Sequence, residues 1–487
     1  MIRRWLRPDL WHRGSTLWYF LPRVVGVGLP LVTLPVITRV LRPEEYGDWV
    51  LAAVFGAFVS GLGNFGLPLA FDRNFFEFEE PRENAALLWG VVGVVTGLLG
   101  TLIGLVWIFQ DALAATVLRI PGRGLLVAWT TTALCVASVK HYFLLYFRNV
   151  DDARSYALFS IDESVLSAVF VVGFVWFLDV GPVGLAWGPL LASVAVLLLL
   201  LARMVRQVPP AFALGPVAAS VRLSLPLFPK ILLGVVGTQF DKWVVGVLGG
   251  SAPAAQYAIG QRLANVVFVV ATALENKFQP ATYRLMFDGA DDAGFRIGRL
   301  LTPFAYLVAG CGLVVTVFAT EAVALLATPE YAGAALVCNI LVLHYALTFF
   351  GKQPQLMFAK RTGLISMFSA SSVAVTVLIT GYAASVGGAL GAAIGTLISG
   401  VLTTGVFVWI SQRSFTIEYE TSSLAAYYGA LGIASAAMLG LAMGAPPLPV
   451  FLAAKGIFVA GYFWLGRRDR VFDRFRAVAR PAPTARS

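Results

Sequence analysis

The sequence predicts an all-α polytopic membrane protein with about fourteen transmembrane helices. Hydrophobic residues make up 58% of the 487 residues and charged residues only 13%, and the mean hydropathy is +0.80. A typical soluble domain carries about 25% charged residues, so this chain has too few to cover a water-facing surface. Apolar runs of about 20 residues, enough to cross roughly 30 Å of hydrocarbon, follow one another along most of the chain.

The apolar runs place the predicted spans in order. Their limits are 17–38, 49–71, 85–109, 125–147, 158–178, 182–204, 223–247, 256–280, 299–326, 333–357, 363–385, 387–410, 423–443 and 447–465. We expect two pseudo-symmetric six-helix lobes, at 15–206 and 222–413, joined by a cytoplasmic linker at 207–221. Two further helices lie at 422–466, and basic segments at 1–14 and 467–487 flank the whole.

An internal repeat supports the division into two lobes. Pro22-Arg23 recurs as Pro229-Lys230 after 207 residues, and the segment 70–73 recurs as 281–284 after 211 residues. A duplicated bundle with cations at matching places is typical of transporters whose substrate site lies between the two repeats.

Glycines recur at four-residue spacing in two of the predicted spans. Such spacing lets two helices approach closely, so it predicts helix contacts there. The glycines concerned are Gly93, Gly97, Gly100 and Gly104 in the third span, and Gly387, Gly391 and Gly395 around the twelfth.

The distribution of basic residues predicts the orientation. Loops on the N-terminal side carry 26 Lys and Arg residues, and the opposite loops carry only four, which are Arg39, Arg42, Arg119 and Arg123. Because basic loops stay in the cytoplasm, we expect both termini on the cytoplasmic side of the membrane. The net charge of +10 is explained by these helix ends and the tail, so we expect no nucleic-acid partner.

The motifs of soluble enzymes are missing from the sequence. There is no Gly-x-Ser-x-Gly elbow, no His-Glu-x-x-His and no Walker loop. Cys135, Cys311 and Cys338 lie far apart in apolar runs, without metal-ligand spacing. We therefore predict no catalytic residues, no metal and no cofactor, and expect a protein that is not an enzyme.

Ionisable residues inside the apolar runs are the candidate functional residues, because each costs roughly 2.5–3.5 kcal/mol at membrane depth unless it has a partner, water or a ligand. The candidate substrate-binding cations, suited to an anion such as a phosphate, are Arg23, Lys230, Lys140 and Arg262. The candidates for a coupling site or a structural ion pair are Asp241, Lys242 and Asp162. Arg73 and Arg284 are predicted interface cations. The alternative is that these side chains reach the interface or pair with one another.

Four stretches resemble one known family. The stretch 29–47 resembles the opening of bacterial polysaccharide-biosynthesis flippases, whose superfamily also holds multidrug and toxin extrusion antiporters. Asp241 to Gly246 with Ala255 to Ala258 is similar to the family's turn between its seventh and eighth spans. Thr328 to Ala335 and Gly388 to Gly395 are similar to the starts of its tenth and twelfth spans. The resemblance extends over roughly 15–465.

This resemblance implies two lobes around a central cavity and transport by alternating access. The implied substrate is a polyprenyl-pyrophosphate-linked oligosaccharide, such as an O-antigen, exopolysaccharide or capsule repeat unit. The implied partners are the lipid bilayer, this glycan lipid, and glycan polymerase and assembly proteins. The alternatives are a drug or cation antiporter of the same fold, a membrane-embedded glycan polymerase or transferase, and a scaffold that transports nothing. The deep bases outnumber the deep acids, which favours an anionic substrate over a cationic one.

The predicted orientation can be tested by cysteine labelling. We expect residues 249–255 to face outward, so a Ser251→Cys variant lacking Cys135, Cys311 and Cys338 should react with an impermeant thiol reagent in intact cells. Labelling that requires membrane disruption would contradict the orientation.

Overall fold

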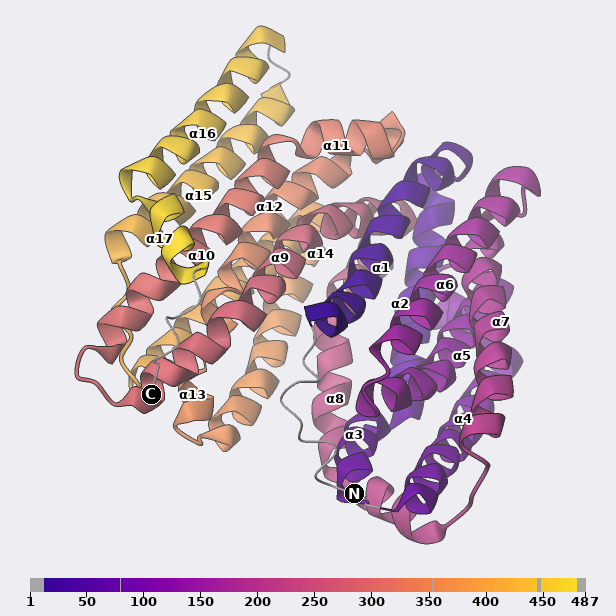
Figure 1. Ribbon diagram of the computed structural model, residues 1–487. Coiled ribbons are helices and arrows are strands. Elements are labelled where there is room, and N and C mark those ends of the chain that lie inside the picture. Colours follow the sequence, from indigo (N-terminus) through magenta and orange to yellow (C-terminus); the bar gives the residue numbers. More distant parts are fainter. Residues whose placement is uncertain (1–12, 79, 353, 445–447, 480–487) are drawn as a thin grey trace. The chain divides into compact units, whose positions relative to one another are not determined.

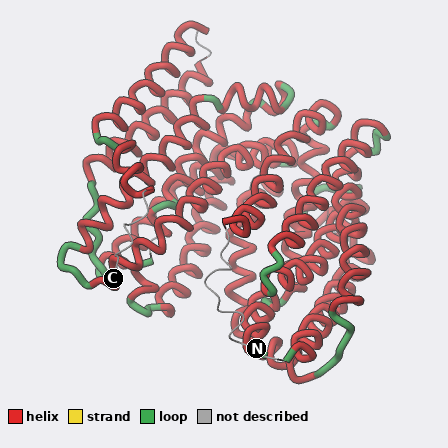
Figure 2. Tube along the Cα trace, in the orientation of Figure 1, coloured by secondary structure: helices red, strands yellow, loops and turns green. Residues whose placement is uncertain are grey.

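The structure, a computed structural model, describes residues 13–78, 80–352, 354–444 and 448–479 (Figure 1). In these ranges the regular elements are all helices, joined mostly by short loops (Figure 2). Twelve of the helices are long and apolar enough to cross a membrane. The prediction of an all-α polytopic membrane protein is therefore confirmed.

The number of spans differs from the fourteen predicted for two reasons. The helix α5 (Gly124–Asn149) has the required length but lies outside the twelve apolar spans, because three threonines, Lys140 and His141 interrupt its apolar sequence. The helix α14 (Thr362–Gln412) includes two predicted spans and is interrupted by non-helical backbone at Gly388.

The first of two compact units contains residues 1–255 and 326–328. Its main helices are α1 (Arg13–Val40), α2 (Pro43–Asn64), α3 (Leu67–Glu77), α4 (Pro81–Ala112), α5, α6 (Ala153–Val172), α7 (Gly184–Gln207) and α8 (Leu214–Gly249). The helix α5 packs against α2, α4 and α7, and α6 packs against α1 and α7. The two helices α4 and α6 end in π-helical turns, η3 (Leu113–Val117) and η4 (Gly173–Phe177).

Aromatic side chains fill the core of this unit. Phe71, Tyr142, Phe143 and Phe147 are fully buried together with aliphatic residues of α4 and α7. The ring of Tyr142 lies edge-on to that of Phe71, with ring centroids 6.1 Å apart. These contacts join α3 to α5, so the rigid part of the unit lies around α5.

The predicted second span is broken into two helices. The chain leaves α2 through Phe65 and Gly66, which have positive φ angles of 48° and 76°. Glycine adopts this left-handed conformation readily, whereas phenylalanine is rarely found there. The ring of Phe65 stacks on Phe228 of α8 with ring centroids 4.5 Å apart, and this contact favours the unusual backbone conformation.

The predicted linker is shorter than 207–221, because α8 already begins at Leu214. Its first turns are packed: Val217 lies where a side chain at Gly90 would be, and Asn74 donates a hydrogen bond to Ser220 across 2.8 Å. The whole helix α8 contacts α2, α3 and α4 of the first unit. The predicted lobe boundaries describe the sequence repeat and stay a prediction.

The second unit contains residues 256–325 and 329–487. Its elements are the larger part of α9 (Ser251–Asp288), then α10 (Ala293–Val317), most of α11 (Ala319–Leu326), η6 (Pro329–Tyr331), α12 (Gly333–Leu347), η7 (Phe350–Lys352), α13 (Gln355–Phe358), α14, α15 (Thr421–Gly444), α16 (Leu448–Arg468) and α17 (Val471–Ala479). The helix α10 packs against α12, α15 and α16, and α12 packs against α14 (Figure 1).

The helix α14 folds back on itself as a hairpin at Gly388, whose φ of 57° and ψ of −135° suit glycine. A Cβ at Gly391 would lie 2.0 Å from the carbonyl oxygen of Ala383, and one at Gly395 would lie 2.8 Å from the Cα of Thr380. The predicted close helix contact is confirmed at these two glycines.

The glycines of the third predicted span behave differently. No described atom lies within 4 Å of a Cβ built at Gly93, Gly97, Gly100 or Gly104. Within the described part of the chain these glycines support no close helix contact, so the same spacing has a packing role in only one of the two places.

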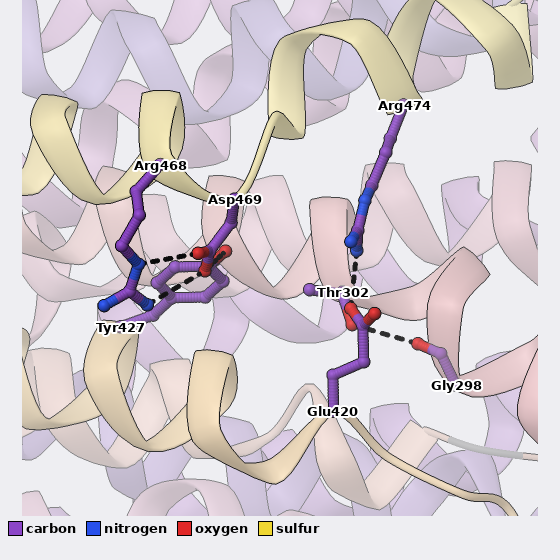
Figure 3. A network of polar contacts seen from close by, with 7 residues as sticks. All are labelled: Gly298, Thr302, Glu420, Tyr427, Arg468, Asp469 and Arg474. Carbon is purple, nitrogen blue, oxygen red and sulfur yellow. Dashed lines mark hydrogen bonds and ion pairs between the residues drawn. The ribbon is translucent and has the colours of Figure 1, made fainter.

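A polar network fastens the C-terminal helix α17 to its own unit (Figure 3). Arg474 forms an ion pair of 2.5 Å with Glu420, which precedes α15. Next to it, Asp469 accepts hydrogen bonds from Arg468 (2.8 Å) and Tyr427 (2.6 Å). Burial alone would raise the pKa of the Asp469 carboxyl, but these hydrogen bonds outweigh it and lower that pKa to about 2. The carboxylate therefore stays ionised and holds the end of α16 to α15.

We expect Gly391→Ala to destabilise the protein, because the new Cβ forces two backbones apart, which typically costs about 1–3 kcal/mol. Gly97→Ala is the matched control, since open space and the higher helix propensity of alanine should leave stability unchanged or raise it by up to ~1 kcal/mol. Thermal unfolding in detergent, followed by size-exclusion fluorescence, measures both. Equal melting temperatures for the two variants would contradict the close contact in the α14 hairpin.

Candidate functional site

Arg23 lies about three turns from the start of α1, directly after Pro22. The helix α1 packs along α6, and the rings of Tyr19 and Tyr156 lie 5.5 Å apart. Arg23 follows one turn beyond Tyr19, and its side chain is exposed. No described atom lies within 4 Å of a Cβ built at Gly26, so the helix surface one turn beyond Arg23 is open.

Lys230 occupies a corresponding place on α8, directly after Pro229. The opposite face of α8 is packed: Phe228 stacks on Phe65, and Ile231 and Val235 lie where side chains at Gly66 and Gly61 would be. Lys230 is about 100–160° away from these three residues at 100° per residue, so its side chain points away from α2 and α3, and it is exposed.

A stripe on α8 continues from Lys230 towards the other end of the helix. Positions 230, 234, 237 and 241 recur on one face, which places Gly234 and Gly237 between Lys230 and Asp241. The two glycines carry no side chain and both are exposed. The stripe therefore consists of two exposed glycines between the exposed Lys230 and the buried Asp241.

Arg23 and Lys230 have no ion-pair partner in the described part of the chain, unlike most acidic side chains on the membrane helices. The acid–base pairs are Asp48 with Arg123, Asp72 with Arg148, Glu163 with Lys140, Glu275 with Lys352, and Glu321 with Lys455. Asp162 is one acid without an ion pair in the described residues, and its side chain is exposed on α6. Arg23 and Lys230 are thus exposed cations without an ion pair, whereas the five acids named above are neutralised.

Lys140, a predicted substrate-binding residue, forms a buried ion pair. Its side chain is only 4% exposed and pairs with Glu163 of α6. Glu163 also accepts a hydrogen bond of 2.8 Å from Ser193 of α7. The structure brings α5, α6 and α7 together through this pair, and the ammonium group does not stand free in open space.

Asp241, Lys242 and Arg262 are placed by two consecutive helices. Asp241 is buried in α8, and its carboxylate accepts the backbone N–H of Lys242 across 2.8 Å. The Lys242 ammonium donates to the carbonyl oxygen of Thr238, 3.3 Å away. Arg262 is half-buried in α9. A pair between Asp241 and Arg262 stays a prediction.

The predicted interface cations differ from each other. Arg73 pairs with Glu77 one turn further along α3 and donates to Asn74 across 2.9 Å. Arg284 is exposed near the end of α9. Both lie within a few residues of a helix end, where a charge needs no buried partner.

The second unit contains an ion pair that the sequence analysis did not predict. Lys352 lies 2.5 Å from Glu275 and donates to Thr272 across 3.0 Å. The sequence repeat gives no signal for this pair: Glu275 lies 211 residues after Asn64, which is uncharged, and Lys352 lies 212 residues after Lys140, which is neither of the two repeat offsets. In the first unit, Asn64 forms an uncharged contact with α5, because its side-chain amide donates a hydrogen bond to Ser138 across 3.0 Å.

Two further polar groups escaped the sequence analysis. Asp48 of α2 bonds to both Arg123 and Ser251. Lys455, buried in the middle of α16, pairs with Glu321. No local sequence pattern pairs Asp48 or Lys455 with partners that lie 75 to 203 residues away.

The geometry supplies exposed cations and paired acids. Within the described residues no group of three or more His, Cys, Asp and Glu side chains is placed to hold a metal ion. The site is therefore suited to binding a charged group and holding it beside bare backbone.

The model of the family of polysaccharide biosynthesis proteins matches residues 13–274. The chain belongs to this family. No curated protein matches it in a sequence search.

Solved structures show a similar fold over nearly the whole chain. The lipid II flippase MurJ in an inward closed conformation has a TM-score of 0.67 at 11% identity, covering 94% of this chain and 99% of that one. An inward-facing multidrug resistance MATE family transporter of the MOP superfamily has a TM-score of 0.57 at 17% identity, covering 82% and 97%. A MATE transporter of Vibrio cholerae has a TM-score of 0.55 at 15% identity, covering 82% and 98%. The family member thus has the fold of MOP superfamily flippases and transporters.

We expect Lys140→Met to lower the amount of folded protein, because removing one member of a buried pair typically costs about 3–5 kcal/mol. The double variant Lys140→Met, Glu163→Gln should restore most of the stability, since it removes both charges. Membrane abundance by immunoblot and the melting temperature in detergent measure the effect. A single variant of normal abundance and stability that fails only in export would show that Lys140 binds substrate.

Proposed function

We propose that the protein is a flippase that moves a polyprenyl-pyrophosphate-linked oligosaccharide, the repeat unit of an O-antigen, exopolysaccharide or capsule, across the bacterial inner membrane by alternating access. The observation that carries the proposal is that Arg23 and Lys230 are exposed on membrane helices without an ion-pair partner in the described residues. An unpaired cation at such a place is costly unless water or a ligand compensates it.

The two cations suit the two phosphates of a pyrophosphate. Arginine can bind a phosphate through two parallel N–H donors, and lysine acts as a point charge. Gly26 and Gly234, one turn beyond Arg23 and Lys230, have open space around them, so a bulky ligand can approach the backbone there. We propose that the repeat brings both cations to one cavity that opens to the cytoplasm.

The family and the fold support a transporter. The matched family is that of polysaccharide biosynthesis proteins, and one similar structure is a lipid II flippase. The two together favour a glycan-bearing lipid over a free sugar or a drug. We propose glycan polymerase and assembly proteins as further partners, because a flipped repeat unit has to be polymerised.

The second candidate is a drug or cation antiporter, and Asp162 is the observation in its favour. This exposed carboxylate lies on α6, the helix that packs along α1. A carrier of cations would use such an acid as its binding group. The pairing of the other deep acids and the exposure of Arg23 and Lys230 favour the anionic substrate.

We expect Arg23→Ala and Lys230→Ala each to impair glycan export while membrane abundance stays normal. Loss of a charge-assisted contact of roughly 1.5–3 kcal/mol should weaken binding by about one to two powers of ten. Arg23→Lys should keep part of the activity, because the charge remains while the paired donors are lost. Complementation of an export-deficient strain, with immunoblots for abundance, measures these effects.

Matched controls exist on the same two helices. Arg39→Ala on α1 and Arg222→Ala on α8 remove exposed cations outside the proposed site, so export should continue. Full export by the Arg23→Ala, Lys230→Ala double variant at normal abundance would refute the two-cation site. Loss of drug resistance in Asp162→Asn, with intact glycan export in the double variant, would favour the antiporter.

A further inference from the structure

The second unit contains an amphipathic cavity that none of the predicted site residues lines. Its polar compartment has a volume of about 400 Å³ and lies between α9, η7, α13 and both halves of α14. An adjoining apolar compartment of about 350 Å³ lies between α13 and the two halves of α14. Both volumes fall in the range of roughly 300–1,000 Å³ that is usual for small-molecule sites.

The two compartments are neighbours that share part of their lining. Phe368 and Phe407, whose ring centroids lie 5.2 Å apart, line both of them. Ser372 and Thr403 also line both. A molecule whose polar group lies in the polar compartment can therefore contact Phe368 and Phe407 with its apolar part.

The apolar compartment suits a hydrocarbon chain. Apart from three serine and threonine residues, its lining consists of aliphatic and aromatic side chains such as Leu364, Val375 and Val406. It lies between membrane-spanning segments, where the surrounding solvent is lipid hydrocarbon. An acyl chain of a bilayer lipid can therefore fill this compartment.

The polar compartment suits a phosphate. It is lined by Lys352, Glu275 and Gln279 together with hydroxyl groups. A lysine ammonium group has three N–H donors; Glu275 and Thr272 accept two of them. The third is available to an oxygen of a ligand, with the ring of Phe268 4.9 Å from the ammonium nitrogen.

The charges around this compartment favour an anion. Glu275 is the only acid among its described lining residues. Further cations lie on the segments that line it, within a few residues of the lining side chains, and they are Lys277, Lys360, Arg361 and Arg413. Lys352 also lies six residues from the end of its span at Phe358, which is close to the level of lipid head groups.

We propose that this cavity binds one phospholipid of net negative charge from the bilayer, with its phosphate on Lys352 and one acyl chain against Phe368 and Phe407. The lipid holds η7, α13 and the α14 hairpin of the second unit together. This site is separate from the two-cation site, and its occupation does not depend on the identity of the transported substrate.

The test is native mass spectrometry of the full-length protein in detergent, titrated with phosphatidylglycerol or with zwitterionic phosphatidylethanolamine. We expect one phosphatidylglycerol to bind at least ten-fold more tightly than phosphatidylethanolamine. Ser372→Trp fills the shared wall and should weaken phosphatidylglycerol binding ten-fold or more. Lys352→Met with Glu275→Gln removes the pair without leaving an unpaired charge and should abolish the preference for the anionic lipid.

Each variant has a matched control in the same unit. Ser385→Trp lies on α14 at an exposed position outside the cavity, and Lys455→Met with Glu321→Gln removes another Lys–Glu pair of the second unit, in which only the lysine is buried. Both should bind phosphatidylglycerol as the unmodified protein does. Equal binding of the two lipids, or undiminished binding by both cavity variants, would overturn the proposal. Tighter binding of undecaprenyl phosphate, with displacement of phosphatidylglycerol, would also overturn it, because the site would then belong to an isoprenoid lipid.

Discussion

The cost of an ionised side chain inside a bilayer organises this structure. Each such charge needs an ion-pair partner, hydration by water or a bound ligand. Different charged residues of this chain are stabilised in different ways. Lys140 with Glu163 joins α5 to α6, and Glu275 with Lys352 joins α9 to η7. Such pairs contribute mainly by specifying which helices meet, because their mutual attraction is largely offset by the desolvation of both charges.

Against this background the exposed cations on α1 and α8 stand out. Both helices carry prolines before and around the cation, which remove backbone hydrogen bonds and permit bending. Both also have glycines on the following turn, so the helix surface next to the charge is bare. A helix that is both bendable and bare beside its cation can enclose a large head group and later release it.

Much of the fold could be predicted from the sequence, because a bilayer demands long apolar helices and the chain supplies them as separate runs. The α14 hairpin was expected as two spans meeting near Gly387, and the structure bends at Gly388. The break at Phe65 was not predictable, since it depends on a ring contact with Phe228, 163 residues away. The packing of α8 on α2, α3 and α4 also depends on tertiary contacts, such as Val217 against Gly90, that hydropathy does not record.

The sequence identified several of the charged residues that lie within the membrane helices, such as Lys140. Their ion-pair partners, and the pair of Lys455 with Glu321, required the three-dimensional structure. The pair between Glu275 and Lys352 also required the three-dimensional structure, because the repeat aligns Glu275 with the uncharged Asn64.

The pair between Lys455 and Glu321 bears on how the chain is made. The helix α16 emerges last among the candidate spans and carries a buried lysine, which weakens its own tendency to leave the translocation channel for lipid. Its acidic partner belongs to α11, which is synthesised 134 residues earlier, and the ring centroid of Phe318, the residue before α11, lies 5.5 Å from the ammonium nitrogen. The earlier helices thus form a receptor for the late one, and insertion of α16 is coupled to the prior assembly of the bundle that it joins.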